Sequence, residues 1–408
     1  MNFDFKKMTT TVLSYTESLI EKFGPREAGS QAGRDCAHEM FDVLSAFADT
    51  TIIDDVKVHT GAFLGWIRIL VTLYVLSTLA LWFGLSWAAS VLLLVGILIM
   101  VFQFFLYRHT IDFLFKKRIG HNVTGILEPD GEVTQQFIVS GHHDSARQFN
   151  FFIHQPKLYG LRVMGGIGVL VGIFLLSAVL TLVSEPVWLT VTVAAVASAG
   201  ALLVVQLWFF YSKKSTPGAG DNLVASVMGM EILSAFAKAK AQGKGLQHTR
   251  LVSVSFDAEE EGLRGAYAYA RAHKPAMQTL PTYLFNIDCL YTKKDMFFLT
   301  SDINGSVKMS ESFAKDCQAV GEALGIKTKV QPIAFLTGGT DAGEIAKIGV
   351  ESTTLMGMPW DNNERAQVYH TMNDTVDNIE PEAILSGLAI IVGMIQKKEK
   401  EAGTAWKA

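Results

Sequence analysis

The stretch LVSVSFDAEEEGLRG, residues 251–265, contains the strongest fold signal in the chain. Its first part is short and rich in β-branched and aromatic residues, so we expect a buried strand over residues 250–256. A helix is expected to follow over residues 263–273. Between the two lie four acidic residues, and an apolar strand that runs directly into carboxylates is costly to bury unless they meet a cation.

Similar strand and helix signals alternate along the rest of the chain. Strands are expected at residues 52–58, 123–127, 136–140, 283–287, 296–299 and 352–356. Helices are expected at residues 11–24, 34–48, 223–240, 306–324 and 381–397. This alternation predicts an α/β fold, with a doubly wound and mostly parallel sheet flanked by helices.

Two long stretches interrupt that pattern with almost no charge. Residues 69–107 carry no charged side chain, and residues 163–212 carry only Glu185. A helix needs about 20 apolar residues to cross a bilayer, so each stretch is long enough for two spans. We therefore predict four transmembrane helices in two inserted hairpins, 61–107 and 161–212, with turns near Gly84 and at Glu185-Pro186. Gly168 and Gly172 have the small-xxx-small spacing that allows close helix packing.

The hairpins divide the remaining chain into three parts of one domain, and the charges predict their side of the membrane. These parts are residues 1–60, 108–160 and 213–398, followed by a solvated tail at 399–408. Lysine and arginine flank the hairpin bases, whereas the two turns have none; the cations are Arg108, Lys116, Lys117, Arg118, Lys157, Arg162, Lys213 and Lys214. Because positive residues stay on the cytoplasmic side, we expect an integral protein of the plasma (inner) membrane with its domain facing the cytoplasm.

Composition excludes several other classes of protein. Only 18% of the 408 residues are charged, against about 25% in an ordinary soluble domain. The net charge of −4 offers no basic face, so nucleic acid is not an expected partner. Three cysteines cannot build a disulfide framework. The lipid bilayer is the partner that composition predicts, and composition leaves the oligomeric state open.

Five segments at predicted strand ends or in loops place acids and histidines where ligands bind in α/β sheets. They read GHHDS (141–145), PGAGDN (217–222), DAEEEGL (257–263), FNID (285–288) and YHTMNDT (369–375). Each alone has an ordinary explanation, such as a helix cap or a solvated charge. Two histidines and three carboxylates from these segments form a mixed nitrogen and oxygen donor set that suits two zinc ions with Asp221 between them.

Local spacing predicts how some of these side chains cooperate. His142 and Asp144 point to the same side of an extended chain, so the carboxylate can accept the second ring N–H. Glu259 and Glu260 point apart, so one can bind a metal while the other acts as a general base.

In this order the five segments resemble metallopeptidase family 28, which includes aminopeptidases, glutamate carboxypeptidase II and glutaminyl cyclases. Gly24–Ser30 (GPREAGS) is similar to that family's opening segment. The resemblance implies the zinc exopeptidase fold. It assigns Glu259 as the catalytic base and Asp144 as the residue that orients the first histidine. The implied ligands of two zinc ions are His142, Asp221, Glu260, Asp288 and His370.

The function that the resemblance implies is a zinc aminopeptidase, which hydrolyses N-terminal residues from peptide substrates; the predicted hairpins would anchor it in the membrane. Glu259 would take a proton from the attacking water and deliver it to the leaving amine. Three alternatives remain open: a glutaminyl cyclase-like acyltransferase, a non-catalytic membrane scaffold, and a carboxypeptidase. The last would need a cation for the terminal carboxylate, for which Arg147, Arg264 and Arg365 are candidates. GGTDA, residues 338–342, resembles a family stretch near the substrate pocket, without an assigned role.

Overall fold

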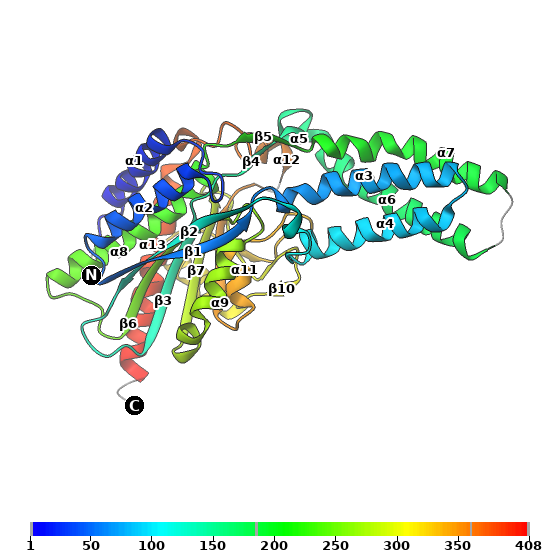
Figure 1. Cartoon of the computed structure of the whole chain (residues 1–408). Coiled ribbons are helices and arrows are strands. Elements are labelled where there is room, and N and C mark those ends of the chain that lie inside the picture. The colour runs from blue at the N-terminus through cyan, green and yellow to red at the C-terminus, as the bar shows by residue number, and fades with distance from the viewer. Residues whose placement is uncertain (1–2, 184–186, 360, 406–408) are drawn as a thin grey trace. The chain divides into compact units, whose positions relative to one another are not determined.

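The computed structural model describes residues 3–183, 187–359 and 361–405, and the chain divides into two compact units (Figure 1). Unit 1 combines residues 1–60, 117–147 and 215–408. Unit 2 combines residues 61–116 and 148–214, which contain both predicted hairpins. The two units are described separately below.

Unit 1 is built on an eight-stranded mixed sheet with the order β1-β2-β6-β3-β7-β12-β8-β11. The four central strands, β6, β3, β7 and β12, run parallel, while β1 and β2 extend the sheet antiparallel at one edge. The strands are β1 (Thr50–His59), β2 (Lys117–Leu127), β3 (Gln135–His142), β6 (Thr249–Phe256), β7 (Thr282–Leu290), β8 (Met296–Leu299), β11 (Lys329–Gln331) and β12 (Glu351–Gly357).

The central strands are buried because helices cover both faces of the sheet. Every residue of β3 is buried. On one face α8 packs on β3 and β6, with α1 and α13 behind it, and α9 and α11 lie together across the sheet (Figure 1). The helices of unit 1 are α1 (Phe5–Phe23), α2 (Gln31–Ser45), α8 (Val224–Ala241), α9 (Arg264–Thr279), α10 (Glu311–Ala323), α11 (Asp341–Ala346), α12 (Asn362–Arg365) and α13 (Pro381–Ala405).

The structure confirms the expected α/β fold and each expected strand and helix of unit 1, with differences at the ends. Helix α9 continues past Pro275, where the prediction stopped at residue 273. Residues 399–405 of the predicted tail are the last turns of α13, and residues 406–408 lie outside the described residues. Glu399 is held there by backbone N–H groups of Gln247, His248 and Thr249. Strand β11 and helix α11 were not predicted.

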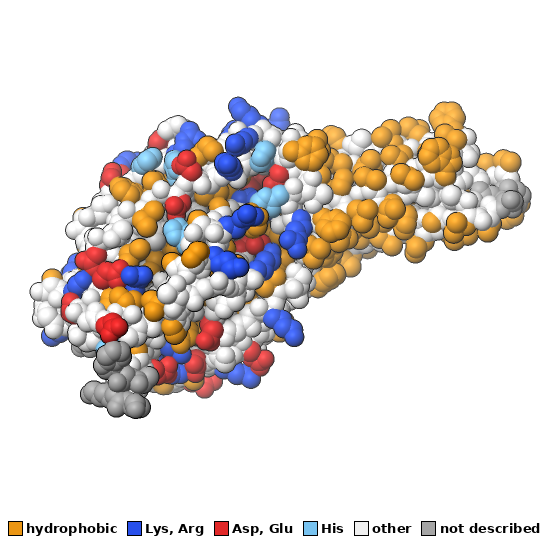
Figure 2. All heavy atoms as spheres, turned by 60° about the horizontal axis from the view of Figure 1, so that its bottom comes forward, with side chains coloured by type: hydrophobic (Ala, Val, Ile, Leu, Met, Phe, Trp, Pro, Cys, Tyr) orange, Lys and Arg blue, Asp and Glu red, His pale blue; other side chains and the backbone are white. Residues whose placement is uncertain are grey.

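Unit 2 is a bundle of four helices that are long and apolar enough to cross a membrane. They are α3 (Ala62–Trp82), α4 (Ser86–Met100, continued as a helix to Phe105), α6 (Tyr159–Leu182) and α7 (Val187–Val204, continued to Phe209). Hydrophobic side chains cover the visible face of this bundle (Figure 2). The predicted turn at Glu185-Pro186 lies outside the described residues.

Polar groups of the bundle join neighbouring helices. The Tyr74 hydroxyl of α3 donates to the Ala197 carbonyl of α7 at 2.7 Å. The hydroxyls of Ser90 in α4 and Thr181 in α6 lie 3.1 Å apart. The predicted close approach at Gly168 and Gly172 is wrong, since a Cβ there would meet nothing within 4 Å. The helices approach instead at Gly166, where a Cβ would lie 2.8 Å from Leu207.

A short two-stranded ladder lies where the chain enters and leaves the second hairpin. It pairs β4 (Arg147–Phe149) with β5 (Tyr211–Ser215), and the short helix α5 (Asn150–Ile153) follows β4. A second small ladder in unit 1 pairs β9 (Ser301–Asp302) with β10 (Val307–Lys308).

Candidate metal centre

The carboxyl ends of three neighbouring parallel strands bring together four of the predicted site residues. His142 is the last residue of β3, and Asp288 lies near the end of β7. Glu259 and Glu260 lie in the turn that follows β6, the strand beside β3. Parallel strands end at the same edge of a sheet, which is why side chains from distant parts of the sequence meet here.

Two further residues come from loops at the same edge. Asp221 lies in the segment Ala219–Leu223 that leads into α8, and His370 follows α12. The Asp374 carboxylate ties this region together, because it accepts the backbone N–H groups of Gly220 at 2.8 Å and Asp221 at 3.3 Å. Asp374 lies in the same segment as His370, YHTMNDT, but the sequence alone indicated no role for it.

The carboxylate of Asp221 lies between two histidines. Its Oδ1 is 3.3 Å from Nε2 of His142, and its Oδ2 is 3.2 Å from Nε2 of His370. Two triads of candidate ligands share Asp221, one with His142 and Asp288 and the other with Glu260 and His370. Within each triad the ligand atoms lie within 4.8 Å of one another. The structure thus brings together all five residues predicted to bind metal.

This donor set fits the two zinc ions that the family resemblance implies. Each triad combines one imidazole nitrogen with two carboxylates, which are donor types that bind zinc, and three protein ligands are the number found in catalytic zinc sites. His142, Asp221 and Asp288 are all buried, and burying several carboxylates together is costly unless a cation balances them. His142, Asp221 and Asp288 would hold one ion, and Asp221, Glu260 and His370 the other.

The Asp144 carboxylate positions both the first histidine and the pair of glutamates. Its Oδ1 lies 3.2 Å from Nδ1 of His142, as the predicted orienting role requires. Its two oxygens also accept the backbone N–H groups of Glu259 and Glu260, each at 3.1 Å. One fully buried side chain therefore connects the end of β3 to the turn after β6.

Glu259 lies beside the first triad. Its Oε2 is 3.8 Å from Nε2 of His142, and Glu259, Glu260 and His142 form a third set of neighbouring ligand atoms. Burial raises the pKa of Glu259 well above its usual value, and the carboxylates of Glu260 and Asp288 raise it further. A raised pKa suits a group that must accept a proton and then give it back.

Arg26 is a positioning residue in the segment GPREAGS, and the sequence alone indicated no role for it. Its fully buried guanidinium donates to the carbonyls of His143 at 2.8 Å, Pro217 at 3.0 Å and Gly218 at 2.9 Å. Its backbone N–H also donates to the Ser145 hydroxyl at 3.0 Å. Arg26 thereby joins the loops that carry His142 and Asp221, which explains the place of GPREAGS beside the site.

Asp341, like Asp374, is an acid near the site for which the sequence alone indicated no role. It begins α11, is fully buried, and neither carboxylate oxygen has a hydrogen-bond partner among the described residues. Burial raises its pKa well above the usual value; the positive charge of His142 opposes that shift, and the Asp288 carboxylate adds to it. The segment GGTDA thus supplies one more carboxylate to an already acidic region.

Backbone strain is concentrated next to the candidate ligands. Ala258, Cys289 and His370 have positive φ values of 62°, 49° and 53°, in a region that residues other than glycine rarely adopt. Each such residue costs on the order of 1–3 kcal/mol and persists only where its surroundings fix it. Ala258 directly precedes Glu259, Cys289 directly follows Asp288, and His370 is itself a candidate ligand. The strained backbone therefore lies where the direction of a site side chain is set.

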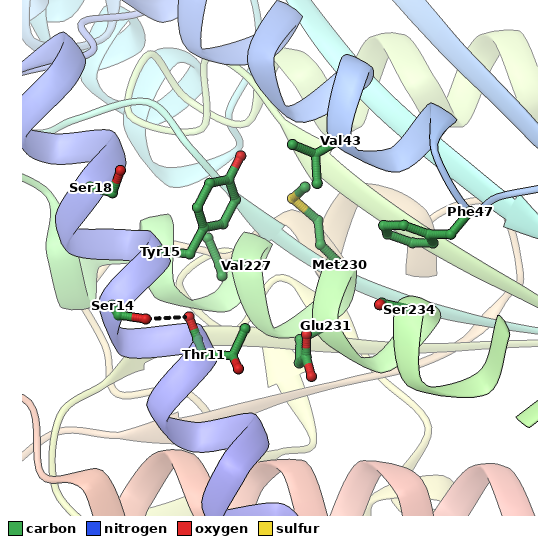
Figure 3. Close-up of a pocket in the computed structure, with 10 residues that line it drawn as sticks. All are labelled: Thr11, Ser14, Tyr15, Ser18, Val43, Phe47, Val227, Met230, Glu231 and Ser234. Carbon is green, nitrogen blue, oxygen red and sulfur yellow. Dashed lines mark hydrogen bonds between the residues drawn. The ribbon is translucent and has the colours of Figure 1, made fainter. Parts of the chain in front are cut away.

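A cavity of about 360 Å³ lies elsewhere in unit 1, between α1, α2 and α8 (Figure 3). It is lined by Thr11, Ser14, Tyr15, Ser18, Val43, Phe47, Val227, Met230, Glu231 and Ser234. None of these residues belongs to the triads, so this cavity is not part of the candidate metal centre.

Solved structures with this fold include zinc exopeptidases and glutaminyl cyclases. A Zn-dependent exopeptidase from Parabacteroides distasonis is 13% identical, with a TM-score of 0.57 over 95% of this chain and 97% of that one. The aminopeptidase LapA of Legionella pneumophila is 11% identical, with a TM-score of 0.54 over 95% and 71%. A glutaminyl cyclase from Bacteroides thetaiotaomicron is 11% identical, with a TM-score of 0.55 over 96% and 97%. At these identities the likeness shows the fold alone.

The family model identifies the sequence more directly. Residues 205–394 match the model of peptidase family M28, while no curated protein matches the chain. The matched region includes Asp221, Glu259, Glu260, Asp288 and His370, whereas His142 and Asp144 precede it. The fold of unit 1 is that of the zinc exopeptidases. The ordered motifs, the shared fold and this match make the chain similar to peptidase family M28 over residues 205–394.

Proposed function

We propose that the protein is a membrane-anchored, two-zinc aminopeptidase whose active site faces the cytoplasm. The observation that carries the proposal is the position of Asp221, which both ligand triads share. Two zinc ions would supply Lewis acidity and lower the pKa of the attacking water. The remaining steps belong to side chains of this chain.

Glu259 is the general base in this proposal. Its carboxylate takes a proton from the attacking water and returns that proton to the leaving amine nitrogen. The Asp144 carboxylate accepts the Glu259 backbone N–H at 3.1 Å and so fixes the backbone position of the general base. His142, which contacts both Asp144 and Asp221, is kept in one ring orientation by the Asp144 carboxylate.

The charges of the site favour a free amino terminus over a free carboxylate as the recognised end of the peptide. Asp288, Glu259 and Glu260 provide negative charge for an α-ammonium group, with Asp341 behind them. The cations proposed for a carboxypeptidase are engaged elsewhere: Arg147 pairs with Glu27, Arg264 donates to Gly262, and Arg365 donates to Asn362.

Two aromatic belts on unit 2 support its location in a bilayer. At one end lie Phe104, Tyr159 and Trp208, and at the turn end the exposed Trp82, Phe83, Trp87 and Trp188. Aromatic residues concentrate at both membrane–water interfaces. Helix α3, with 21 residues at about 1.5 Å each, matches the ~30 Å hydrocarbon core. The cations at the hairpin bases favour the cytoplasm for that end.

Peptide cleavage by zinc-loaded protein in detergent tests the proposed activity, using matched free and N-acetylated peptides. We expect cleavage of free-amine peptides only. The Glu259→Gln variant should lose about 10³-fold in kcat/KM while retaining its zinc. An Asp377→Asn variant, which changes an exposed acid in the loop after His370, is the control and should keep full activity. Release of ammonia from peptides that begin with glutamine, without peptide cleavage, would instead establish a cyclase.

A further inference from the structure

The segment Arg108–Lys116 connects the end of the first hairpin to β2 and has an unusual composition for an exposed loop. Its sequence, RHTIDFLFK, combines cations at both ends with four large apolar residues. We call it the juxtamembrane loop. It lies entirely in unit 2 and begins three residues after the helix that continues α4 to Phe105.

A buried glutamine holds this loop in one conformation. The Gln103 side chain donates to Asp112 Oδ1 at 2.9 Å, and its carbonyl oxygen accepts the backbone N–H groups of Thr110 at 3.0 Å and Ile111 at 3.3 Å. Gln103 is fully buried, and Asp112 is 6% exposed. The only acid of the loop is therefore directed inward, so its charge does not offset the cations on the outside.

The apolar residues of the loop divide into an inner and an outer pair. Ile111 is buried, and Phe115 packs so closely on Gly65 of α3 that a Cβ there would lie 2.3 Å from its ring. Phe113 and Leu114, in contrast, are 75% and 59% exposed. The inner pair and the Gln103 hydrogen bonds thus present two large apolar side chains outward on a fixed backbone.

We propose that the juxtamembrane loop binds the surface of an anionic bilayer. Phe113 and Leu114 enter the interfacial region, while Arg108 and Lys116, with the exposed Lys213 and Lys214 at the other hairpin base, bind lipid phosphates. The inference rests on the proposed membrane insertion of unit 2. A bilayer is the occupant because the loop exposes large apolar side chains directly after the exposed apolar helix α4 in the chain, and its outward charge is positive, the combination that interfacial segments use.

Spin labels on engineered cysteines test the depth of the loop. The native cysteines, Cys36, Cys289 and Cys317, are all buried, so Phe113→Cys offers an accessible thiol. Two reference positions bracket it: Leu94→Cys on the exposed side of α4 and Phe335→Cys on the surface of unit 1. In lipid nanodiscs, collision of each label with oxygen is compared with collision with a water-soluble nickel chelate.

The proposal predicts that labels at positions 113 and 94 favour oxygen and that the label at 335 favours the nickel chelate. If 113 behaves like 335 while 94 favours oxygen, the loop does not enter the bilayer and the inference fails, although insertion of unit 2 stands. If 94 also favours nickel, unit 2 is not inserted and the proposed location fails with it. Shielding of 113 that appears only as protein concentration rises would assign the loop to a second copy and overturn the inference.

Lipid charge tests the role of the cations. Phosphatidylglycerol in a phosphatidylcholine nanodisc should increase the oxygen preference at position 113 severalfold, and the double change Lys116→Glu, Lys214→Glu should remove that increase. The matched control is Lys327→Glu with Lys329→Glu, two exposed lysines of unit 1, and it should leave the increase intact. Equal responses in both double variants would overturn the headgroup contact.

Discussion

The two units of this chain place their polar and apolar groups in opposite ways. Unit 1 buries acids beside one another at a sheet edge, among them Asp144, Asp221, Asp288 and Asp341. Unit 2 exposes its apolar side chains: of the large hydrophobic residues exposed among those described, all but Leu324, Phe335 and Met372 belong to it. Unit 1 therefore needs cations inside, whereas unit 2 needs an apolar solvent outside.

The largest effect should follow from removing the carboxylate that both triads share. Asp221→Asn keeps the shape of the side chain but loses the charge between His142 and His370. We expect zinc content to fall from two ions per chain and kcat/KM to drop by about 10³-fold or more. Elemental analysis and peptide hydrolysis measure the two effects. Full zinc content with full activity would break the account of unit 1.

The next largest effect should be on the stability of unit 1. Arg26→Met removes a buried guanidinium and leaves the carbonyls of His143 and Pro217 without that donor, while the Gly218 carbonyl keeps only the Leu223 N–H. The expected loss is about 3 kcal/mol in the free energy of unfolding, because buried polar groups are costly to leave unpaired. Denaturant titration measures it, with Arg271→Met on the exposed side of α9 as the control. Similar stability in both variants would contradict the role of Arg26.

The metal-free protein, kept in chelator, should become less stable as pH rises, because its buried acids are most stable when protonated. Burial raises the pKa of Asp302 to about 6, of Asp257 and Asp288 to about 7, and of Asp374 to about 8. Unfolded aspartate has a pKa of about 3.9, so these groups stabilise the fold below that pH. Their contribution is lost as pH rises through about 6–8. The unfolding temperature in chelator should therefore be higher at pH 5 than at pH 8.

Zinc should reduce this pH dependence, since cations then balance the carboxylates that protons balance in its absence. The same unfolding scans with zinc supply the comparison. A chelated protein that becomes more stable between pH 5 and pH 8 would show that these acids are not buried as described.

The smallest effect is expected in unit 2. Tyr74→Phe removes the hydrogen bond from α3 to the Ala197 carbonyl, and single hydrogen bonds between membrane helices contribute only about 0.6 kcal/mol. Unfolding in mixed detergent micelles, with Tyr267→Phe on α9 as a comparison, should detect a loss well below that of Arg26→Met. A loss as large as 3 kcal/mol would show that unit 2 depends on polar contacts as strongly as unit 1.

Much of this architecture could be predicted from sequence because its signals are local. The run Leu251–Phe256, the uncharged stretches and the five polar segments each carry their pattern within a few residues. The Asp144 carboxylate was expected to reach His142, since two positions along an extended chain face the same way. Its hydrogen bonds to the backbone of Glu259 and Glu260 depend on how β3 and β6 pair, which no local pattern contains.

The features that escaped prediction depend on contacts between distant parts of the chain. Arg26 reaches Gly218 across 192 positions. Asp341 lies near Asp288 only because β12 pairs with β7 and α11 packs beside them. The last turns of α13 looked like a charged tail, yet Glu399 caps backbone groups at the start of β6. The weak glycine spacing at 168 and 172 failed for the same reason, since the packing partners decide which glycine is approached.

Zinc itself gives the most direct test of the central claim, that Asp221 lies between two metal ions. Anomalous diffraction at the zinc absorption edge, from crystals of the zinc-loaded protein, locates each ion independently of the protein model. The account predicts two peaks, one beside His142 and Asp288 and one beside Glu260 and His370, with Asp221 contacting both. One peak, or peaks that do not contact Asp221, would contradict it.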